Sequence, residues 1–289
     1  MFDVANDGSD TFSSLAKYVS IADLAENLIN RDGITLFAPT NAAFVDFKNG
    51  SPDGLADKLQ TVQWQDHLED LLLYHTVPTI IPSETIITGG LKKSTTINDE
   101  IIRYTLSDTT IGDTTITDIF VNTDAQVIDA DINIENGVIH AIDNVLFPPW
   151  VSKSIIDTAS SNPYKKTLES LVELLGDFDL KDQLSLPGGY TVFAPTNEAF
   201  QQDIANGINL SPDQLSSVLS YHVVEGVYPE SVLVDGFTLT TLQGDKIRFT
   251  STTDGSGTTM VNDETIITPN ILANNGIVHI IDGVLIPDG

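Results

Sequence analysis

The sequence predicts an α+β protein made of two tandem units, and two observations carry this prediction. A ten-residue segment at 35–44 recurs at 191–200, with eight of the ten positions identical. In each half, helix-type patterns come first and β-type alternation follows. An internal repeat decides the architecture before any local pattern does. We therefore place the boundary near Pro148-Pro149-Trp150 and expect units at residues 1–149 and 150–289.

The repeated segment is typical of a strand-to-helix corner. Thr-Leu-Phe in the first copy and Thr-Val-Phe in the second favour a strand, and the following Ala-Pro ends it because proline lacks an N–H. The Thr-Asn pair then begins a short helix, since both side chains can accept hydrogen bonds from its first turn. We expect a structural role, not a catalytic one, for Thr40, Asn41, Thr196 and Asn197.

Helices are predicted on both sides of this corner. Residues 1–33 carry apolar side chains at helical spacing behind an Asp10-Thr11 cap, which predicts one amphipathic helix. The segments 51–53 and 211–213 both read Ser-Pro-Asp, a typical helix start. Each following helix ends at a Tyr-His pair. The longer first copy contains Trp64 and His67, which predicts additional helix there.

Short strands are predicted from about residue 80 in the first unit and from about residue 237 in the second. Threonine, isoleucine and valine alternate with polar residues at 95–97, 101–105, 114–116, 237–242 and 246–250. Residues 254–257 predict a hairpin or loop tip. Each unit closes alike, at 136–148 and 275–287, where Asn-Gly predicts a tight turn before a strand with a buried apolar face.

The composition excludes several classes of function. The 289 residues carry a formal charge of −28, spread over both halves, and such a surface repels nucleic acid and anionic lipid. Without cysteine there is no disulfide and no thiolate chemistry. No apolar run approaches the ~20 residues of a membrane span. Residues 1–7 do not resemble a signal peptide, so we expect a mature chain from which any signal has been trimmed.

Three landmarks occur twice in the same order: the Phe-Ala-Pro-Thr-Asn corner, the Tyr-His pair, and a final Asn-Gly-Val-Ile-His-Ala-Ile-Asp or Asn-Gly-Ile-Val-His-Ile-Ile-Asp strand before Leu-x-Pro. This order resembles the fasciclin domain, in tandem over nearly the whole chain. The resemblance implies that each unit is a twisted, wedge-shaped β-sandwich with helices packed alongside. It also implies a secreted or cell-surface protein that binds cell-surface or matrix proteins or polysaccharides without catalysis. Weak association of the chain with itself is a further expectation.

The resemblance also implies candidate adhesion residues. They are the Tyr-His pairs and an Asp-Ile pair before the last strand, here Tyr74, His75, Tyr221, His222, Asp131 and Ile132. An integrin-type partner would read the acid through a bound cation. The second unit departs from this pattern, because Asn270 stands in the place of the acid.

Four of the five histidines recur in register, His75 with His222 and His140 with His279. A metal or catalytic role is one interpretation. We favour another, in which each ring bonds the Thr-Asn corner or the backbone, because buried polar rings need partners. Asp143 and Asp282 follow the strand histidines by three residues, and we expect them to be structural as well.

The sequence contains no motif that identifies an enzyme. There is no G-x-S-x-G elbow, no phosphate-binding glycine pattern and no zinc-ligand spacing. The acidic run 129–135 resembles a calcium loop but has Ile134 where such a loop needs glycine and His140 where it needs glutamate. We therefore expect no catalytic residue, metal site or cofactor, and only weak attraction of Ca²⁺ to the acidic surface.

Two questions stay open at this point. The sequons at Asn49 and Asn209 are both followed by proline, and their serines are explained as helix caps, so the sequence does not decide whether they are glycosylated. An alternative function is a small-molecule or carbohydrate binder, or a hydrolase, that uses a cleft between the two units. A pocket with converging polar groups and a perturbed carboxylate or histidine would favour that alternative.

Overall fold

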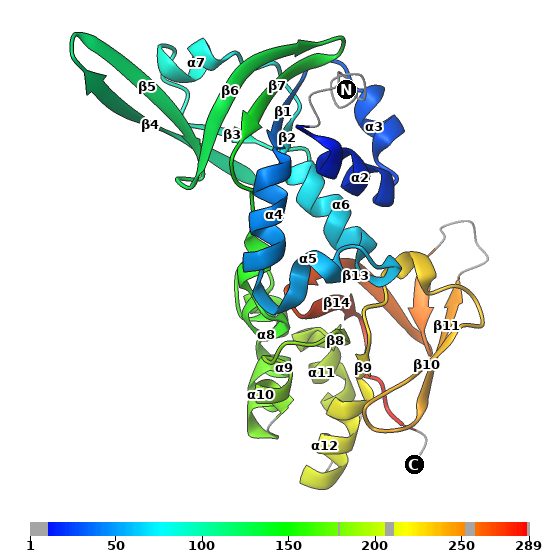
Figure 1. The fold of residues 1–289 in the computed structure, drawn as a ribbon. Coiled ribbons are helices and arrows are strands. Elements are labelled where there is room, and N and C mark those ends of the chain that lie inside the picture. The colour runs from blue at the N-terminus through cyan, green and yellow to red at the C-terminus, as the bar shows by residue number, and fades with distance from the viewer. Residues whose placement is uncertain (1–10, 179, 206–210, 252–257, 288–289) are drawn as a thin grey trace. The chain divides into compact units, whose positions relative to one another are not determined.

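The computed structural model describes residues 11–178, 180–205, 211–251 and 258–287, and it divides into two compact units, Met1–Pro148 and Pro149–Gly289 (Figure 1). Each unit contains a seven-stranded sheet together with helices. The predicted α+β class with two tandem units is therefore confirmed.

The first unit begins with helices around one early strand and ends with a β-meander. Its elements in chain order are α2 (Ser13–Ile21), α3 (Ala25–Ile29), β1 (Ile34–Pro39), α4 (Asn41–Gly50), η1 (Pro52–Gly54), α5 (Leu55–Lys58), η2 (Val62–Trp64), α6 (Gln65–Tyr74), β2 (Thr76–Val77), α7 (Ser83–Ile87), β3 (Lys93–Thr95), β4 (Ile101–Ile111), β5 (Thr114–Val121), β6 (Ala125–Ile134) and β7 (Gly137–Ile142).

The strand of the first corner, β1, lies inside the sheet beside the last strand of the unit. The strand order is β2-β1-β7-β6-β5-β4-β3, and β1 runs parallel to β7 with Phe37 opposite His140. All other neighbouring pairs are antiparallel. Every residue of β1 is buried, as expected for a strand covered on both faces. This pairing brings the corner and the strand histidine together although about 100 residues separate them in the chain.

The second unit repeats this arrangement. Its strand order is β10-β11-β12-β13-β14-β8-β9, and β8 runs parallel to β14 with Phe193 opposite His279. Its elements are η3 (Pro149–Ser152), α8 (Ile155–Ala159), α9 (Lys165–Asp177), α10 (Leu180–Gln183), β8 (Tyr190–Pro195), α11 (Asn197–Ala205), α12 (Pro212–Tyr221), β9 (Val223–Glu225), η4 (Glu230–Val232), β10 (Thr238–Thr240), β11 (Lys246–Ser251), β12 (Thr259–Val261), β13 (Glu264–Ala273) and β14 (Gly276–Ile281).

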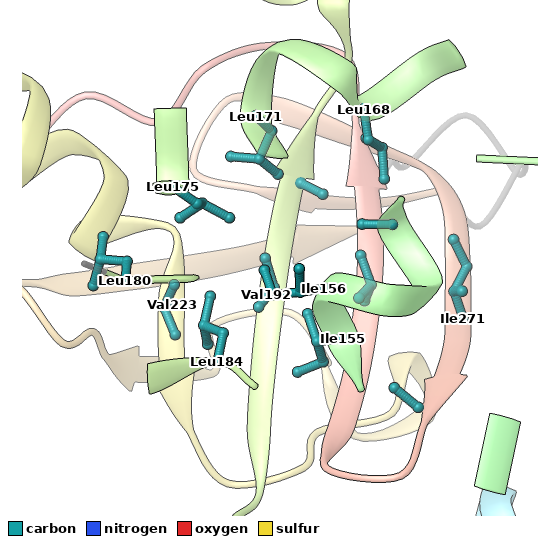
Figure 2. Close-up of a cluster of buried hydrophobic side chains, with 14 of the residues drawn as sticks. Ile155, Ile156, Leu168, Leu171, Leu175, Leu180, Leu184, Val192, Val223 and Ile271 are labelled. Carbon is teal, nitrogen blue, oxygen red and sulfur yellow. The ribbon is translucent and has the colours of Figure 1, made fainter. Parts of the chain in front are cut away.

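Leucines on α9 build much of the second unit's core. Leu168, Leu171 and Leu175 recur at helical spacing, and all three are buried. Figure 2 shows them gathered over Val192 of β8, with side chains from α8 and α10 completing the cluster. Burial of such a leucine contributes roughly 2 kcal/mol. The amphipathic pattern of α9 therefore fixes the face of the helix that packs on the sheet.

The N-terminal segment differs from its prediction. In the described part, which starts at residue 11, two helices replace the single helix expected over 1–33. Asp23, between α2 and α3, has a φ of +54°, a left-handed conformation that ends a helix. The residue at the cap position of α2 is Phe12, and it makes no side-chain capping bond, so Thr11 does not occupy the cap position. Asp10, the other predicted cap residue, lies outside the described residues.

The two Ser-Pro-Asp helix starts are also less alike than predicted. Ser211 caps α12 directly, in a reciprocal capping box with Gln214, and α12 continues to the Tyr-His pair. In the first unit Asp53 and Gly54 are left-handed, so Ser51 is followed only by η1 and α5. The corresponding helix α6 starts at Gln65 and includes His67, so the additional helix of the first unit is η1, α5 and η2.

The turns and the β4–β5 hairpin differ in their bounds from the predictions. The turn before each last strand consists of Glu135-Asn136 and of Asn274-Asn275, so the glycine of the predicted Asn-Gly turn is already the first strand residue. The β4–β5 hairpin extends to Ile111, well beyond the predicted strand at 101–105. The hairpin or loop tip predicted at 254–257 lies outside the described residues.

Candidate functional site

The strand histidine of the first unit, His140, lies fully buried on β7 and connects two other segments to it. Its Nδ1 accepts a hydrogen bond from the backbone N–H of Asp131 at 3.1 Å, and its Nε2 lies 2.8 Å from the carbonyl oxygen of Ile81. Because Nδ1 accepts, Nε2 must carry the proton and donate to Ile81, which defines a neutral tautomer. His140 therefore holds β6 and the segment before α7 against β7.

The second unit builds the same arrangement around His279. Its Nδ1 accepts from the N–H of Asn270 at 3.2 Å, and its Nε2 donates to the carbonyl of Tyr228 at 2.9 Å. The ring stacks on Phe193 with 5.4 Å between centroids. Burial lowers the pKa of His279 to about 4, and it lowers the pKa of His140 as well.

The helix-end histidine, His75, uses the opposite tautomer. Its Nε2 accepts from the N–H of Leu146 at 2.8 Å, so its Nδ1 carries the proton and donates to the carbonyl of Leu71 at 2.8 Å. The ring thereby connects the end of α6 to the Leu-x-Pro segment after β7. His222 makes the matching bonds, and burial lowers the pKa of both rings to about 4.

All four recurring histidines are thus neutral, and both nitrogens of each ring bond backbone groups. Their partners are backbone atoms and not the Thr-Asn corner, which was the other structural partner considered. The fifth histidine, His67, is also fully buried and packs on Trp64 with 4.4 Å between ring centroids. No histidine of the chain therefore presents its ring to solvent.

The Thr-Asn corner has its own hydrogen bonds. Thr40 caps α4 by accepting from the N–H of Ala43 at 3.3 Å. The Asn41 side chain accepts from the N–H of Ser14 at 2.8 Å and donates to the hydroxyl of Ser13 at 3.0 Å, which connects α4 to α2. The second unit repeats both roles through Thr196, which accepts from Ala199, and Asn197, which bonds Ser170 and Lys166.

The aspartates after the strand histidines close the sheet locally. Asp143 accepts from the N–H of Gln126 through Oδ1 at 2.7 Å and donates its own N–H to the Gln126 carbonyl at 3.1 Å. Asp282 makes the same reciprocal pair with Thr265. Each carboxylate therefore has a backbone partner at the start of the neighbouring strand.

The Tyr-His pairs lie in the interior. Tyr74 and His75 are 4% and 1% exposed, and their counterparts Tyr221 and His222 are equally buried. The Tyr74 hydroxyl accepts from Asn122 at 2.8 Å, so it is bonded inside the unit. In this conformation these side chains offer almost no surface to a partner protein. Their predicted adhesion role stays a prediction, and their described contacts are internal.

Asp131 lies at a bulge in β6, with a φ of +60°. Its carboxylate accepts from the N–H of Ser83 at 2.8 Å and also from the Ser83 hydroxyl, at the first residue of α7. Burial alone would raise the pKa of this carboxyl, but the two bonds from Ser83 hold the pKa below its ordinary value. Asn270 has a φ of +57° and accepts from the N–H of Glu230 at 2.9 Å. The amide of the second unit therefore does the same work as the acid.

Removing this acceptor is expected to weaken the first unit. Asp131→Ala should lower the free energy of unfolding by about 2 kcal/mol, because the Ser83 N–H loses its partner and alanine is strained at positive φ. Asp131→Asn should cost less than half of that, since an amide oxygen can replace the carboxylate as it does at Asn270. Urea denaturation at pH 7 measures both. The exposed neighbour Asp129, replaced by alanine, is the control, and equal effects at 129 and 131 would contradict this role.

Sequence reasoning missed Thr35 and its counterpart Thr191. Thr35 is fully buried on β1, donates its hydroxyl to the Thr79 carbonyl at 2.6 Å and accepts from the N–H of Ile81 at 2.8 Å. Thr191 bonds Gly226 and Tyr228 in the same way. The signal was present, because threonine opens both copies of the repeat, but it reads equally well as a β-favouring residue.

Asn136 and Gly137 were also underestimated as a simple turn. The Asn136 amide donates to the carbonyls of Leu28 at 2.8 Å and Arg31 at 2.9 Å, so it closes the end of α3. A Cβ on Gly137 would lie 2.0 Å from the carbonyl oxygen of Ile34, so only glycine fits beside β1. In the second unit Asn275 donates to the carbonyls of Leu184 and Leu186. A Cβ on Gly276 would likewise lie 2.0 Å from the carbonyl oxygen of Tyr190.

A surface hollow of about 390 Å³ lies beside the bulge of the first unit, lined on β6 by Asp131 and Asn133 and at the turn by Asn136. These three polar side chains already bond protein groups: Asp131 bonds Ser83, Asn133 donates to the carbonyl of Asp131, and Asn136 closes α3. The carboxylates of Asp32 and Glu135 also line the hollow, so its lining is acidic, and three of its five polar side chains are committed to bonds within the protein.

The acidic run and the sequons can be placed as well. Asp129, Asn133 and Glu135 are exposed on β6 and its turn, while the Asp131 carboxylate is bonded to Ser83. Across the described ranges, no group of three or more His, Asp or Glu side chains could hold a metal ion. Asn49 is exposed at the end of α4, whereas Asn209 lies outside the described residues.

None of the helices described here combines the length and the apolar character needed to cross a membrane.

Known proteins resemble this chain over one or both units. A fasciclin-like arabinogalactan protein of Arthroderma benhamiae is 28% identical over 287 residues, which is 96% of this chain and 64% of that protein. Periostin of Homo sapiens is 33% identical over 246 residues, 84% of this chain and 26% of that protein. The cell surface glycolipoprotein MPB83 of Mycobacterium bovis is 39% identical over 138 residues, 46% of this chain and 60% of that protein. The chain thus spans less than two thirds of the length of each of these relatives.

A solved FAS1 domain pair from the insect cell adhesion molecule Fasciclin I covers 95% of this chain and 97% of its own, at 18% identity and a TM-score of 0.46. The family model named Fasciclin domain matches residues 10–148 and again residues 166–287, once in each unit. Together the two matches include most of the chain, so this protein belongs to the fasciclin domain family and carries two tandem copies of the domain.

Proposed function

We propose that this protein is an adhesion or matrix-interaction protein of the cell exterior that binds protein or polysaccharide partners without catalysis. Family membership supports this proposal, because the fasciclin relatives include periostin and a protein named for the cell surface. The net charge of −28 supports partners other than nucleic acid. The same charge would attract Ca²⁺ weakly to the surface, without a dedicated site.

The observation that carries the proposal is the state of the histidines. All five are buried, and the four that recur have both ring nitrogens bonded to backbone groups. A general base needs a ring that can reach a substrate, and a metal ligand needs a free nitrogen. The repeated motif therefore acts as a frame, and what the protein offers to a partner is its exposed, acid-rich surface.

Adhesion of the full chain tests this proposal. Plates coated with the chain should retain cells, or capture matrix proteins and polysaccharides, in a saturable way at physiological salt, with and without millimolar Ca²⁺. A soluble, non-adhesive protein of similar net charge is the control for charge alone. We expect Asp131→Asn to adhere as well as the parent, because the carboxylate serves α7 internally.

Two results would contradict the proposal. One is retention no greater than that of the charge-matched control under any ionic condition. The other is turnover of ester or glycoside substrates by the purified chain, which would favour the hydrolase alternative.

A further inference from the structure

The half of the β4–β5 hairpin nearest its turn is a two-stranded ribbon that pairs with no other strand of the sheet (Figure 1). Among the described residues, β3 pairs with β4 only up to Arg103, and β6 pairs with β5 only at Phe120 and Val121. Beyond these points β4 and β5 pair only with each other, as far as Ile111 and Thr114. Every side chain from residue 107 to residue 116 is exposed. Both long edges of this ribbon therefore lack a neighbouring strand.

The turn fixes which backbone groups lie on the open edge of β4. The hairpin closes through Gly112 and Asp113, so Ile111 and Thr114 flank a two-residue turn. In such hairpins the flanking pair exchanges hydrogen bonds and the next pair does not. By this alternation the N–H and C=O groups of residues 108 and 110 point away from β5.

One hydrogen bond nearer the base of the hairpin agrees with this assignment of the outward-pointing backbone groups. Tyr104 is an even number of residues from Asp108, and it donates its N–H to the carbonyl of Lys92 at 2.9 Å, on the side away from β5. The backbone groups of Asp108 and Thr110 continue that same side toward the tip, where β3 has already ended. An extended segment of about five residues can pair there as an added strand.

The two faces of the ribbon differ in chemistry. One face carries Ile111 and Ile116, which are 69% and 50% exposed, with Asp118 farther from the turn on the same face. The other face carries Asp108, whose carboxylate accepts from the hydroxyl of Thr117 at 2.7 Å. Because side chains alternate along a strand, a segment added beside β4 would place every second side chain over each face. Apolar and cationic side chains in alternation would match this ribbon.

Charge selects among the strands that could pair there. Between Arg103 and Lys153 the sequence contains no lysine or arginine, and it contains eight acids: Asp108, Asp113, Asp118, Asp124, Asp129, Asp131, Glu135 and Asp143. Three of these acids lie in the hairpin itself. A second copy of this ribbon would bring like charges together, which is unfavourable across strands. A basic segment would instead be attracted.

We propose that the open edge of β4 from residue 107 to residue 111 binds an extended protein segment that alternates Lys or Arg with Val or Ile, by strand addition. Its significance in the cell depends on the adhesion function proposed above, for which it supplies a partner class. The binding itself does not depend on that function and can be measured without cells or matrix.

The test uses the full chain and a blocked seven-residue peptide that alternates lysine with valine. We expect saturable binding that weakens as salt rises, with slower hydrogen exchange at the amides of Asp108 and Thr110. Thr110→Pro removes one edge N–H and should weaken binding at least tenfold, since proline is tolerated where an N–H faces solvent. Asp108→Lys should weaken binding by a similar factor. Circular dichroism and the melting temperature verify that each variant is folded.

The chain offers a matched control for the proline. Thr115 lies directly opposite Thr110, and its N–H faces the other edge, so Thr115→Pro should leave peptide binding unchanged. N-methylation of every second residue blocks one edge of the peptide, so one version carries it on the valines and another carries it on the lysines. The version whose blocked edge faces β4 should bind at least tenfold more weakly than the unmodified peptide. Equal binding by all three peptides would overturn the proposal in favour of general charge attraction. Unchanged binding by folded Thr110→Pro and Asp108→Lys would also overturn it, whatever the adhesion assay shows.

Discussion

Gly137→Ala is expected to lower the free energy of unfolding of the first unit by about 3 kcal/mol. The new Cβ would lie 2.0 Å from the carbonyl oxygen of Ile34 and 2.9 Å from its carbonyl carbon. Gly137 pairs directly with Ile34 in the parallel β1–β7 ladder, so neither backbone can move without loss of hydrogen bonds in the centre of the sheet. Overpacking a rigid interior ordinarily costs about 1–3 kcal/mol, and a clash with backbone belongs at the upper end of that range.

Urea denaturation followed by tryptophan fluorescence measures this effect in each unit. Trp64 belongs to the first unit and Trp150 to the second, so versions that keep one tryptophan report on one unit. Gly276→Ala should produce the matching loss in the second unit, where the Cβ meets the Tyr190 carbonyl. Gly50→Ala is the control, because a Cβ added there would meet no atom within 4 Å outside its chain neighbours and its own helix backbone, and it should be neutral or slightly stabilising. If Gly137→Ala unfolds like Gly50→Ala, the close approach of the two strands is not rigid.

Acid is expected to destabilise both units between pH 6.5 and pH 4 through the buried histidines. Burial lowers the pKa of His75, His222 and His279 from 6.5 to about 4, so the unfolded chain binds more protons than the folded chain in this interval. The stability that depends on keeping these rings neutral is therefore fully present above pH 6.5, and it is lost as the pH falls toward 4. For each of these rings, the free energy of unfolding should fall by roughly 2 kcal/mol by pH 5.

The carboxylates oppose this trend, because protonating them reduces the mutual repulsion of a chain that carries −28. A comparison with His75→Gln separates the two effects, since glutamine does not titrate while the acidic residues are unchanged. Between pH 7 and pH 5 the parent should lose about 2 kcal/mol more than His75→Gln does. Identical pH profiles for the two proteins would show that His75 takes up no proton when the chain unfolds.

Local patterns were sufficient for those features that depend on neighbouring residues. Thr40 and Thr196 were predicted as caps because a cap bonds residues two or three positions away. The same cap was wrongly predicted for Asn41 and Asn197, whose side-chain oxygens accept from the N–H groups of Ser14 and Ser170, 27 positions earlier. The Ser211 cap is local for the same reason. The single helix predicted over 1–33 failed at Asp23, and the helix start at Ser51 failed at Asp53, because both aspartates adopt a left-handed conformation that composition does not reveal.

By itself the sequence determined the duplication, the α+β class and the family, since a repeated order of motifs can be read without coordinates. Only the tertiary structure decided which atoms those motifs bond. The Nδ1 of His140 bonds Asp131, Asn136 closes a helix more than 100 residues earlier, and Gly137 is required by a carbonyl on another strand. The open edge of β4 likewise depends on where β3 and β6 stop pairing. The physical reason is the same in each case: such contacts join segments that are distant in the chain, and chain proximity does not encode them.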